Sequence, residues 1–125
     1  MVTSTLSAET LSLYAGLDAA IAMRDQLKEM LGADHNLTLR ALVDNKSTVD
    51  TVHATISLTT DKRLRKEIAA IKQMMRKGNL HELKWVPTKL MLADALTKRG
   101  VNNLRLMKVM QTGRLSHDYM NSVKF

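Results

Sequence analysis

Residues 37–45 read Leu-Thr-Leu-Arg-Ala-Leu-Val-Asp-Asn, and this stretch decides the fold class. Every second residue from Leu37 to Val43 is apolar and falls on one side of an extended chain, while Leu42 adds an apolar contact on the other side. The pattern predicts a short, mostly buried strand that ends at Asp44. Ligands of open α/β sheets sit outside the carboxyl ends of the strands, so Asp44 is a candidate ligand for a metal or substrate. Asp is also a favoured turn and capping residue, and that interpretation stays open.

A second strand is predicted at residues 80–86, and Pro87 closes it because proline has no amide hydrogen for the ladder. Serine and threonine residues that can cap a helix mark where the helices around the two strands begin, and glycine residues mark where they end. The predicted helices run from Ser4 or Ser7 to Leu31, over 45–54, over 61–77 after a cap at Thr59 or Thr60, over 89–99 and over 103–111, before a polar tail.

Two strands joined by helices form a crossover, so they are expected to be parallel neighbours. The sequence therefore predicts an α/β fold with two adjacent parallel strands, about 37–43 and 80–86, flanked by helices. One domain is predicted at residues 1–100, followed by a C-terminal helix and tail at 101–125. Two parallel strands are marginal by themselves. We therefore expect part of a larger α/β domain whose further strands precede Met1, with an open edge on the 37–43 strand that invites pairing with another chain.

The charge is unevenly distributed along the chain. The net charge is +7, but residues 36–125 alone carry seventeen basic and seven acidic side chains, a balance of +10. This excess predicts a polyanionic partner, most often nucleic acid, and the alternative is a solvated basic surface without a specific ligand. The absence of cysteine excludes disulfides and thiolate chemistry. Without an apolar run of membrane length or a signal peptide, the chain is expected to be intracellular, cytoplasmic or nuclear, and not secreted.

Three carboxylates come from elements that can meet at one edge of such a sheet. Glu9 lies in the first turn of the first helix, Asp44 ends the first strand, and Asp94 lies in the helix after the second strand. Clustered carboxylate oxygens are the ligands that Mg²⁺ or Mn²⁺ prefers. Two such ions can stabilise the attacking and leaving oxygens of a phosphodiester. The alternative for Glu9 and Asp94 is an ordinary carboxylate near the start of a helix.

Several segments resemble one family in the same order along nearly the whole chain. These segments are Ser7-Ala8-Glu9, Val43-Asp44-Asn45-Lys46-Ser47, Asp61-Lys62-Arg63-Leu64-Arg65, Trp85-Val86-Pro87, Leu92-Ala93-Asp94-Ala95-Leu96-Thr97-Lys98 and Gln111-Thr112-Gly113-Arg114-Leu115. Together they resemble the ribonuclease H domain at the C-terminal end of copia-type retrotransposon polyproteins. The Asp-Asn-Lys-Ser and Ala-Asp-Ala-Leu-Thr-Lys segments, taken together, are specific to this family.

The resemblance implies a ribonuclease H fold, a five-stranded mixed sheet whose last two strands are parallel neighbours. It implies hydrolysis of the RNA strand of RNA–DNA hybrids with two Mg²⁺ ions during reverse transcription. Four acidic residues hold the metals in that family, and Glu9, Asp44 and Asp94 match the second, third and fourth. The first lies on the family's first strand, and no segment of this sequence matches it.

This departure leads us to expect a polyprotein fragment that lacks the family's first three strands and is inactive, or nearly so, alone. Its partners would be an RNA–DNA hybrid and the reverse transcriptase portion upstream, or a second copy paired through the open strand edge. The predicted nucleic-acid-binding residues are Lys46, Lys62, Arg63, Arg65 and Lys66. The alternatives are a non-catalytic basic nucleic-acid-binding or interaction module and, third, an unrelated helical adaptor.

Overall fold

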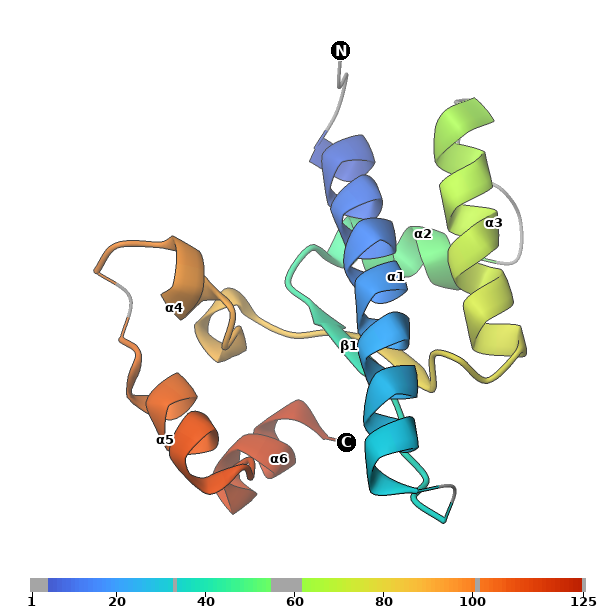
Figure 1. The fold of residues 1–125 in the computed structure, drawn as a ribbon. Helices are drawn as coiled ribbons and strands as arrows, with labels where there is room; N and C mark the ends of the chain where they lie inside the picture. The colour runs from blue at the N-terminus through green and yellow to red at the C-terminus, as the bar shows by residue number, and fades with distance from the viewer. Residues whose placement is uncertain (1–4, 33, 55–61, 101, 125) are drawn as a thin grey trace. The chain divides into compact units, whose positions relative to one another are not determined.

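The computed structural model describes residues 5–32, 34–54, 62–100 and 102–124 (Figure 1). The chain divides into two compact units, an N-terminal unit of residues 1–85 and a C-terminal unit of residues 86–125. The expected domain at 1–100, followed by a C-terminal helix and tail, stays a prediction. The N-terminal unit contains α1 (Thr5–Leu31), β1 (Arg40–Val43), α2 (Lys46–His53), α3 (Lys62–Arg76) and β2 (Glu82–Trp85). The C-terminal unit contains the 3-10 helix η1 (Thr88–Leu90), α4 (Asp94–Thr97), α5 (Leu104–Thr112) and α6 (His117–Val123).

The two strands pair in parallel, as predicted, with Arg40 opposite Glu82 and Val43 opposite Trp85. Helices flank them, so the coarse prediction of an α/β arrangement with two adjacent parallel strands is confirmed. Each strand has four residues and is shorter than predicted. Within the described residues the sheet has only these two strands, so β1 and β2 each have one edge without a strand partner. Pairing of the β1 edge with another chain stays a prediction.

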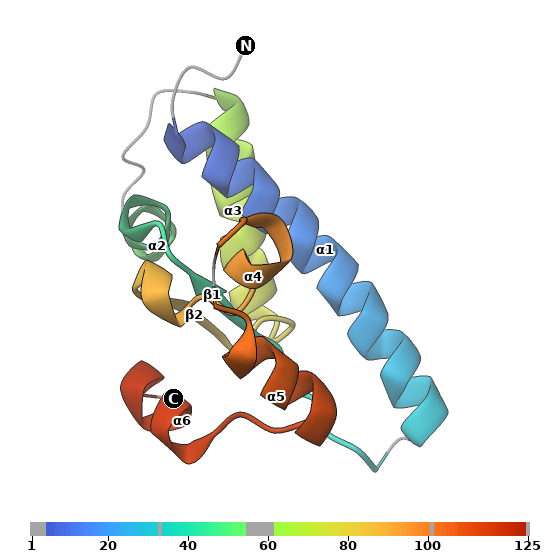
Figure 2. The same cartoon turned by 90° about the vertical axis from the view of Figure 1, so that its left-hand side faces the viewer.

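The core of the N-terminal unit lies where the three helices cover the strands. Its buried side chains come from α1, α2, the end of α3 and the β2 region, namely Leu17, Val49, Val52, Ile71, Leu80 and Leu83. Helices α1 and α3 lie side by side (Figure 1). Helix α1 runs antiparallel to β1, so the N-terminal half of α1 and the carboxyl end of β1 lie toward the same end of this unit (Figures 1 and 2). The predicted connection at 55–60, its threonine caps and Asp61 lie outside the described residues.

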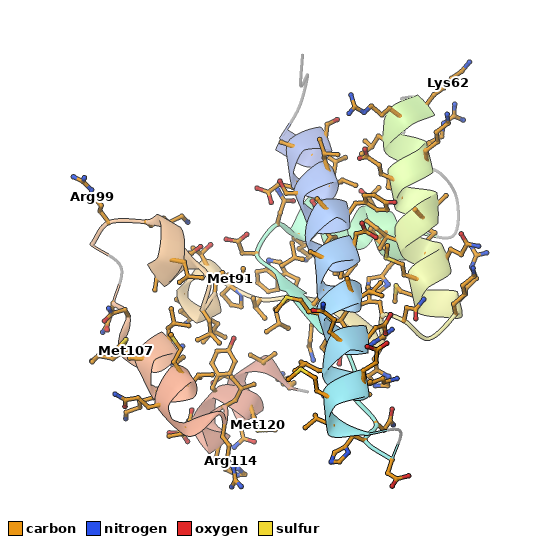
Figure 3. The ribbon with its side chains drawn as sticks, viewed as in Figure 1. Lys62, Met91, Arg99, Met107, Arg114 and Met120 are labelled. Atoms are coloured by element: carbon orange, nitrogen blue, oxygen red, sulfur yellow. The ribbon has the colours of Figure 1, made fainter. Side chains whose placement is uncertain are left out.

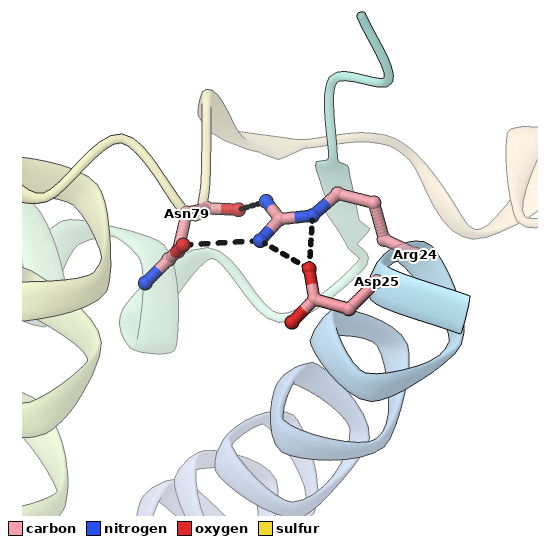
Figure 4. Close-up of polar contacts among 3 residues, drawn as sticks. All are labelled: Arg24, Asp25 and Asn79. Atoms are coloured by element: carbon pink, nitrogen blue, oxygen red, sulfur yellow. Dashed lines mark hydrogen bonds and ion pairs between the residues drawn. The ribbon is translucent and has the colours of Figure 1, made fainter. Parts of the chain in front are cut away.

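A buried arginine fixes α1 to the turn between α3 and β2. The Arg24 side chain is 12% exposed. One guanidinium nitrogen donates to the Asn79 carbonyl oxygen at 2.8 Å, and another donates to Asn79 Oδ1 at 3.0 Å (Figure 4). Gly78, directly before Asn79, has φ +80°, a conformation that glycine adopts without steric cost. The planar guanidinium therefore satisfies two oxygens of a tight turn at once.

We expect Arg24→Ala to lower the free energy of unfolding by about 1.5–3 kcal/mol, because two hydrogen bonds to a charged group are lost and the half-buried Asn79 oxygens lose their partner. Arg24→Lys should not restore the loss, because an ammonium cannot reproduce the two-pronged contact. Asp25→Ala is the control, since Asp25 touches the same guanidinium but is 60% exposed. Urea unfolding of the three variants measures this. Equal destabilisation by Arg24→Ala and Asp25→Ala would contradict the assignment.

Two predictions for the C-terminal unit are wrong. The expected helix over 89–99 is two short helices, η1 and α4, because Met91 is extended with ψ 106°. The Leu90 carbonyl oxygen accepts a hydrogen bond from the Tyr119 hydroxyl at 2.7 Å and does not continue an α-helix. The expected polar tail contains α6, which Ser116 caps by accepting from the Tyr119 amide at 3.1 Å. Tyr119 is 1% exposed, so this helix belongs to the packed part of the unit.

Candidate nucleic-acid and metal site

Asp44 directly follows β1, as predicted, and its side chain is half-buried. The cap of α2 is Asn45, whose side chain accepts from the Thr48 amide at 3.1 Å. The Asp44 carbonyl oxygen accepts from Trp85 Nε1 at 3.2 Å, which joins the carboxyl ends of β1 and β2. Among the described residues no donor bonds to the Asp44 carboxylate. The carboxylate is therefore not used as the cap of α2, and it remains available to a ligand.

Glu9 lies one turn further into α1 than predicted, because the helix begins at Thr5 and its first turn contains no acidic residue. Its side chain is half-buried and, within the described ranges, has no hydrogen-bond or ion-pair partner. Glu9 belongs to the N-terminal half of α1, and this half lies toward the same end of the unit as the carboxyl end of β1 (Figure 2). Glu9 and Asp44 thus belong to the same unit.

Two buried hydroxyl groups accompany these carboxylates in the sequence. Thr10 follows Glu9, and Thr48 lies in the first turn of α2 after Asp44. Both side chains are fully buried, and neither Oγ1 atom has a hydrogen-bond partner among the described residues. A buried hydroxyl without a partner costs about 1–3 kcal/mol. These two hydroxyl groups can therefore still form hydrogen bonds, and they lie in the unit that contains Glu9 and Asp44.

Asp94 belongs to the C-terminal unit, where it is the first residue of α4. Its carboxylate pairs with Lys98 Nζ at 3.2 Å, and the side chain is 13% exposed. The meeting of Asp94 with Glu9 and Asp44 at one edge stays a prediction, because Asp94 lies in a different unit. In the part of the chain that the structure describes, no group of three or more histidine, aspartate or glutamate side chains is arranged to hold a metal ion.

The predicted nucleic-acid-binding residues are all exposed. Four of them belong to α3, whose buried stripe is Leu64, Ile68 and Ile71. With 3.6 residues per turn, Lys62, Arg65 and Lys66 fall on one side of the helix, away from that stripe. We call these three residues the α3 basic face. Figure 3 shows Lys62 extending away from the ribbon at the start of α3.

The other two predicted contacts are placed differently. Arg63 is 81% exposed and lies 3.8 Å from Glu67, so part of its charge is compensated. Lys46 is exposed at the first position of α2, two residues after Asp44. Lys72 does not belong to the basic face, because its Nζ donates to the Ala54 carbonyl oxygen at 2.6 Å.

Sequence reasoning missed one group of functional candidates, in the C-terminal unit. Lys89 and Arg105 line a cavity of about 500 Å³, and the Arg105 guanidinium carbon lies 5.1 Å from the centre of the Tyr119 ring. Burial raises the pKa of the Tyr119 hydroxyl, and the nearby Arg105 charge opposes this rise. The spacing of Ser116, Tyr119 and Val123 is helical and was the available signal for α6.

No family model, curated protein or solved structure matches the chain significantly. Within the described ranges, none of the helices combines the length and apolar character needed to cross a membrane.

Proposed function

We propose that this chain is a ribonuclease H-like domain of a copia-type retrotransposon polyprotein, and that it binds RNA–DNA hybrids through the α3 basic face. One observation carries the proposal. The two strands are parallel neighbours, and an acidic residue with a free carboxylate follows the first of them directly. The same unit contributes Glu9 from the antiparallel α1. This is the arrangement that the resemblance of the Val43–Ser47 segment implies.

The metal part of the proposal rests on the chemistry of the donors. Glu9 and Asp44, both in the N-terminal unit, would contribute ligands to Mg²⁺, since carboxylate oxygens are its preferred protein ligands, and the resemblance adds Asp94 as a further ligand. Magnesium ions usually keep several waters, so the two carboxylates of the N-terminal unit need not supply every ligand. A bound metal ion would stabilise the negative charge that develops on a phosphodiester during hydrolysis.

The acidic residues of this chain set a limit on hydrolysis. Three of the family's four metal-binding acids have a match, and these three would repel one another without the metal. Asp94 also forms an ion pair with Lys98, which competes with metal binding. We therefore propose that the chain alone hydrolyses RNA–DNA hybrids weakly or not at all, with the reverse transcriptase portion as the partner that would restore activity.

The α3 basic face supports the binding part of the proposal. Lys62, Arg65 and Lys66 form no ion pair within the described residues, so their charges are available to backbone phosphates. Contacts to phosphates are independent of sequence and weaken as salt is added, because condensed counterions are released on binding. Double-helical RNA is recognised mainly by shape and by its phosphates and 2′-hydroxyls, which suits a helix face whose charged residues are all cations.

The second candidate function is hybrid binding without catalysis. The α3 basic face favours this second candidate. All three cations of that face are present, whereas only three of the family's four metal-binding acids have a match in this chain. Both candidates predict hybrid binding, and only the first predicts cleavage.

The test combines the full chain with a labelled RNA–DNA hybrid, with and without Mg²⁺, and compares wild type with Asp44→Asn. Cleavage of the RNA strand that requires Mg²⁺ and disappears in Asp44→Asn supports the hydrolytic function. Hybrid binding that persists in Asp44→Asn, without cleavage in either protein, supports the non-catalytic module. Absence of hybrid binding at low salt overturns both.

A further inference from the structure

The C-terminal unit contains a cavity of about 500 Å³ between the η1–α4 region and α5. Its wall combines the apolar side chains of Leu90, Met91 and Leu104 with the cations Lys89 and Arg105. Pockets that bind small molecules usually measure roughly 300–1,000 Å³ and combine apolar walls with a few polar groups. The size and the lining of this cavity are both within that description.

The two cations carry charges that the protein does not compensate. Both also line a second hollow of about 590 Å³ beside the first, next to Ser122. Within the described residues no carboxylate pairs with Lys89 or Arg105. Asp94 belongs to the same wall, but its carboxylate is already paired with Lys98 at 3.2 Å. The cavity therefore has an excess of two positive charges.

Arg105 is held in place by Tyr119. The guanidinium carbon lies 5.1 Å from the centre of the Tyr119 ring, within the range of a cation–π contact. Tyr119 itself is 1% exposed, and its hydroxyl donates to the Leu90 carbonyl oxygen at 2.7 Å. The chain of contacts from Leu90 through Tyr119 to Arg105 links η1, α6 and α5. It places the Arg105 side chain beside the cavity and restrains it in part, which reduces the entropic cost of binding.

We infer that this cavity binds a phosphate monoester that carries a flat or apolar organic group, of which a nucleoside monophosphate is representative. A phosphate monoester carries close to two negative charges at neutral pH, which matches the two unpaired cations. Arg105 can donate two parallel hydrogen bonds to it, and Lys89 adds a point charge. The organic group would lie against Leu90, Met91 and Leu104. This site is separate from the α3 basic face and does not depend on the proposed function.

The experiment titrates the full chain, labelled with ¹³C at the methionine methyl groups, with adenosine monophosphate. Met91, labelled in Figure 3, lines the cavity, whereas Met23 and Met30 belong to α1 in the other unit. We expect the Met91 signal to shift in a saturable way while the α1 signals stay in place. Adenosine and inorganic phosphate, added separately, should each bind at least about tenfold more weakly, because each lacks one of the two kinds of contact.

Two variants and one matched control complete the test. Arg105→Gln and Lys89→Gln should each weaken binding by about tenfold or more, since each removes a charged hydrogen-bond donor. Lys89→Gln leaves the contact between Arg105 and Tyr119 intact, so it distinguishes lost binding from lost packing. Arg114→Gln removes an exposed charge outside the cavity and should have no effect (Figure 3). No saturable shift of Met91 at millimolar nucleotide, or equal weakening by Arg114→Gln and Lys89→Gln, would overturn the inference.

Discussion

Replacing Ile71 by alanine is expected to destabilise the N-terminal unit by about 2–5 kcal/mol, the usual cost of removing a large buried aliphatic side chain from a core. Ile71 has 0% exposure. It lies on the buried stripe of α3, which packs against α1 and α2. A sheet of two strands supplies little hydrogen bonding of its own. The stability of this unit therefore depends on the helices that cover the sheet, and Ile71 is the best-buried side chain that α3 contributes.

The single tryptophan makes this prediction measurable on the N-terminal unit alone. Trp85 ends β2, and its Nε1 donates to the Asp44 carbonyl oxygen, so its fluorescence reports on the joined strand ends. We expect urea unfolding followed at Trp85 to shift strongly in Ile71→Ala. The control is Gln73→Ala, an exposed substitution on the same helix that should change stability by less than about 0.5 kcal/mol. Equal midpoints for the two variants would show that α3 does not hold this core together.

The N-terminal unit could be predicted from the sequence because its signals are local. The alternation of apolar residues from Leu37 to Val43 indicates a strand whichever strand it pairs with, and the following residues predict a short helix over 45–54. The structure confirms the parallel pairing, and Asn45 caps α2 through the Thr48 amide. The charge pattern of α3 is also local, since apolar residues at helical spacing leave its cations exposed.

The C-terminal unit could not be predicted in the same way, because its shape depends on contacts between distant residues. The Tyr119 hydroxyl donates to the carbonyl oxygen of Leu90, which lies 29 positions earlier in the chain. Leu90 is the last residue of η1, so this bond joins the end of η1 to the buried side of α6. No local pattern at residues 89–99 shows that one carbonyl oxygen there is used by a side chain so far along the chain. The cavity at Lys89 and Arg105 depends on the same contacts and was missed for the same reason.

The positions of the candidate residues within helices and strands were predicted in part, and their role in a site stays a prediction. The sequence correctly predicted Asp44 at the carboxyl end of a strand, and the structure shows that Asn45 takes over the capping role that Asp44 could have had. Glu9 lies one turn deeper in its helix than expected. Convergence of the three acids depends on tertiary arrangement, which local patterns do not determine, and Asp94 lies in the other unit.

Removing the α3 basic face is expected to weaken hybrid binding severely. In counterion-release theory each phosphate contact is worth nearly a factor of ten at 0.1 M salt, so the triple variant Lys62→Gln, Arg65→Gln and Lys66→Gln should lose roughly a few hundredfold in affinity. The fold should persist, because all three side chains are exposed and lie away from Leu64, Ile68 and Ile71. The loss should be similar for hybrids of any sequence, since phosphate contacts carry no base information.

The matched control removes the same amount of charge elsewhere. Arg99→Gln, Lys108→Gln and Arg114→Gln, combined in one protein, also lower the net charge from +7 to +4, and all three residues are exposed in the C-terminal unit. If binding depended only on overall charge, the two triple variants would lose affinity equally. We expect the control to keep most of the affinity of the wild type.

The most direct measurement is the dependence of hybrid affinity on salt concentration for the wild type and the two triple variants. Hybrid binding through the α3 basic face predicts that its removal lowers the slope of log affinity against log salt by about 2 to 3, while the control keeps the slope of the wild type. An unchanged slope in the α3 variant, or equal changes in both variants, would contradict the assignment of this face as the nucleic-acid interface.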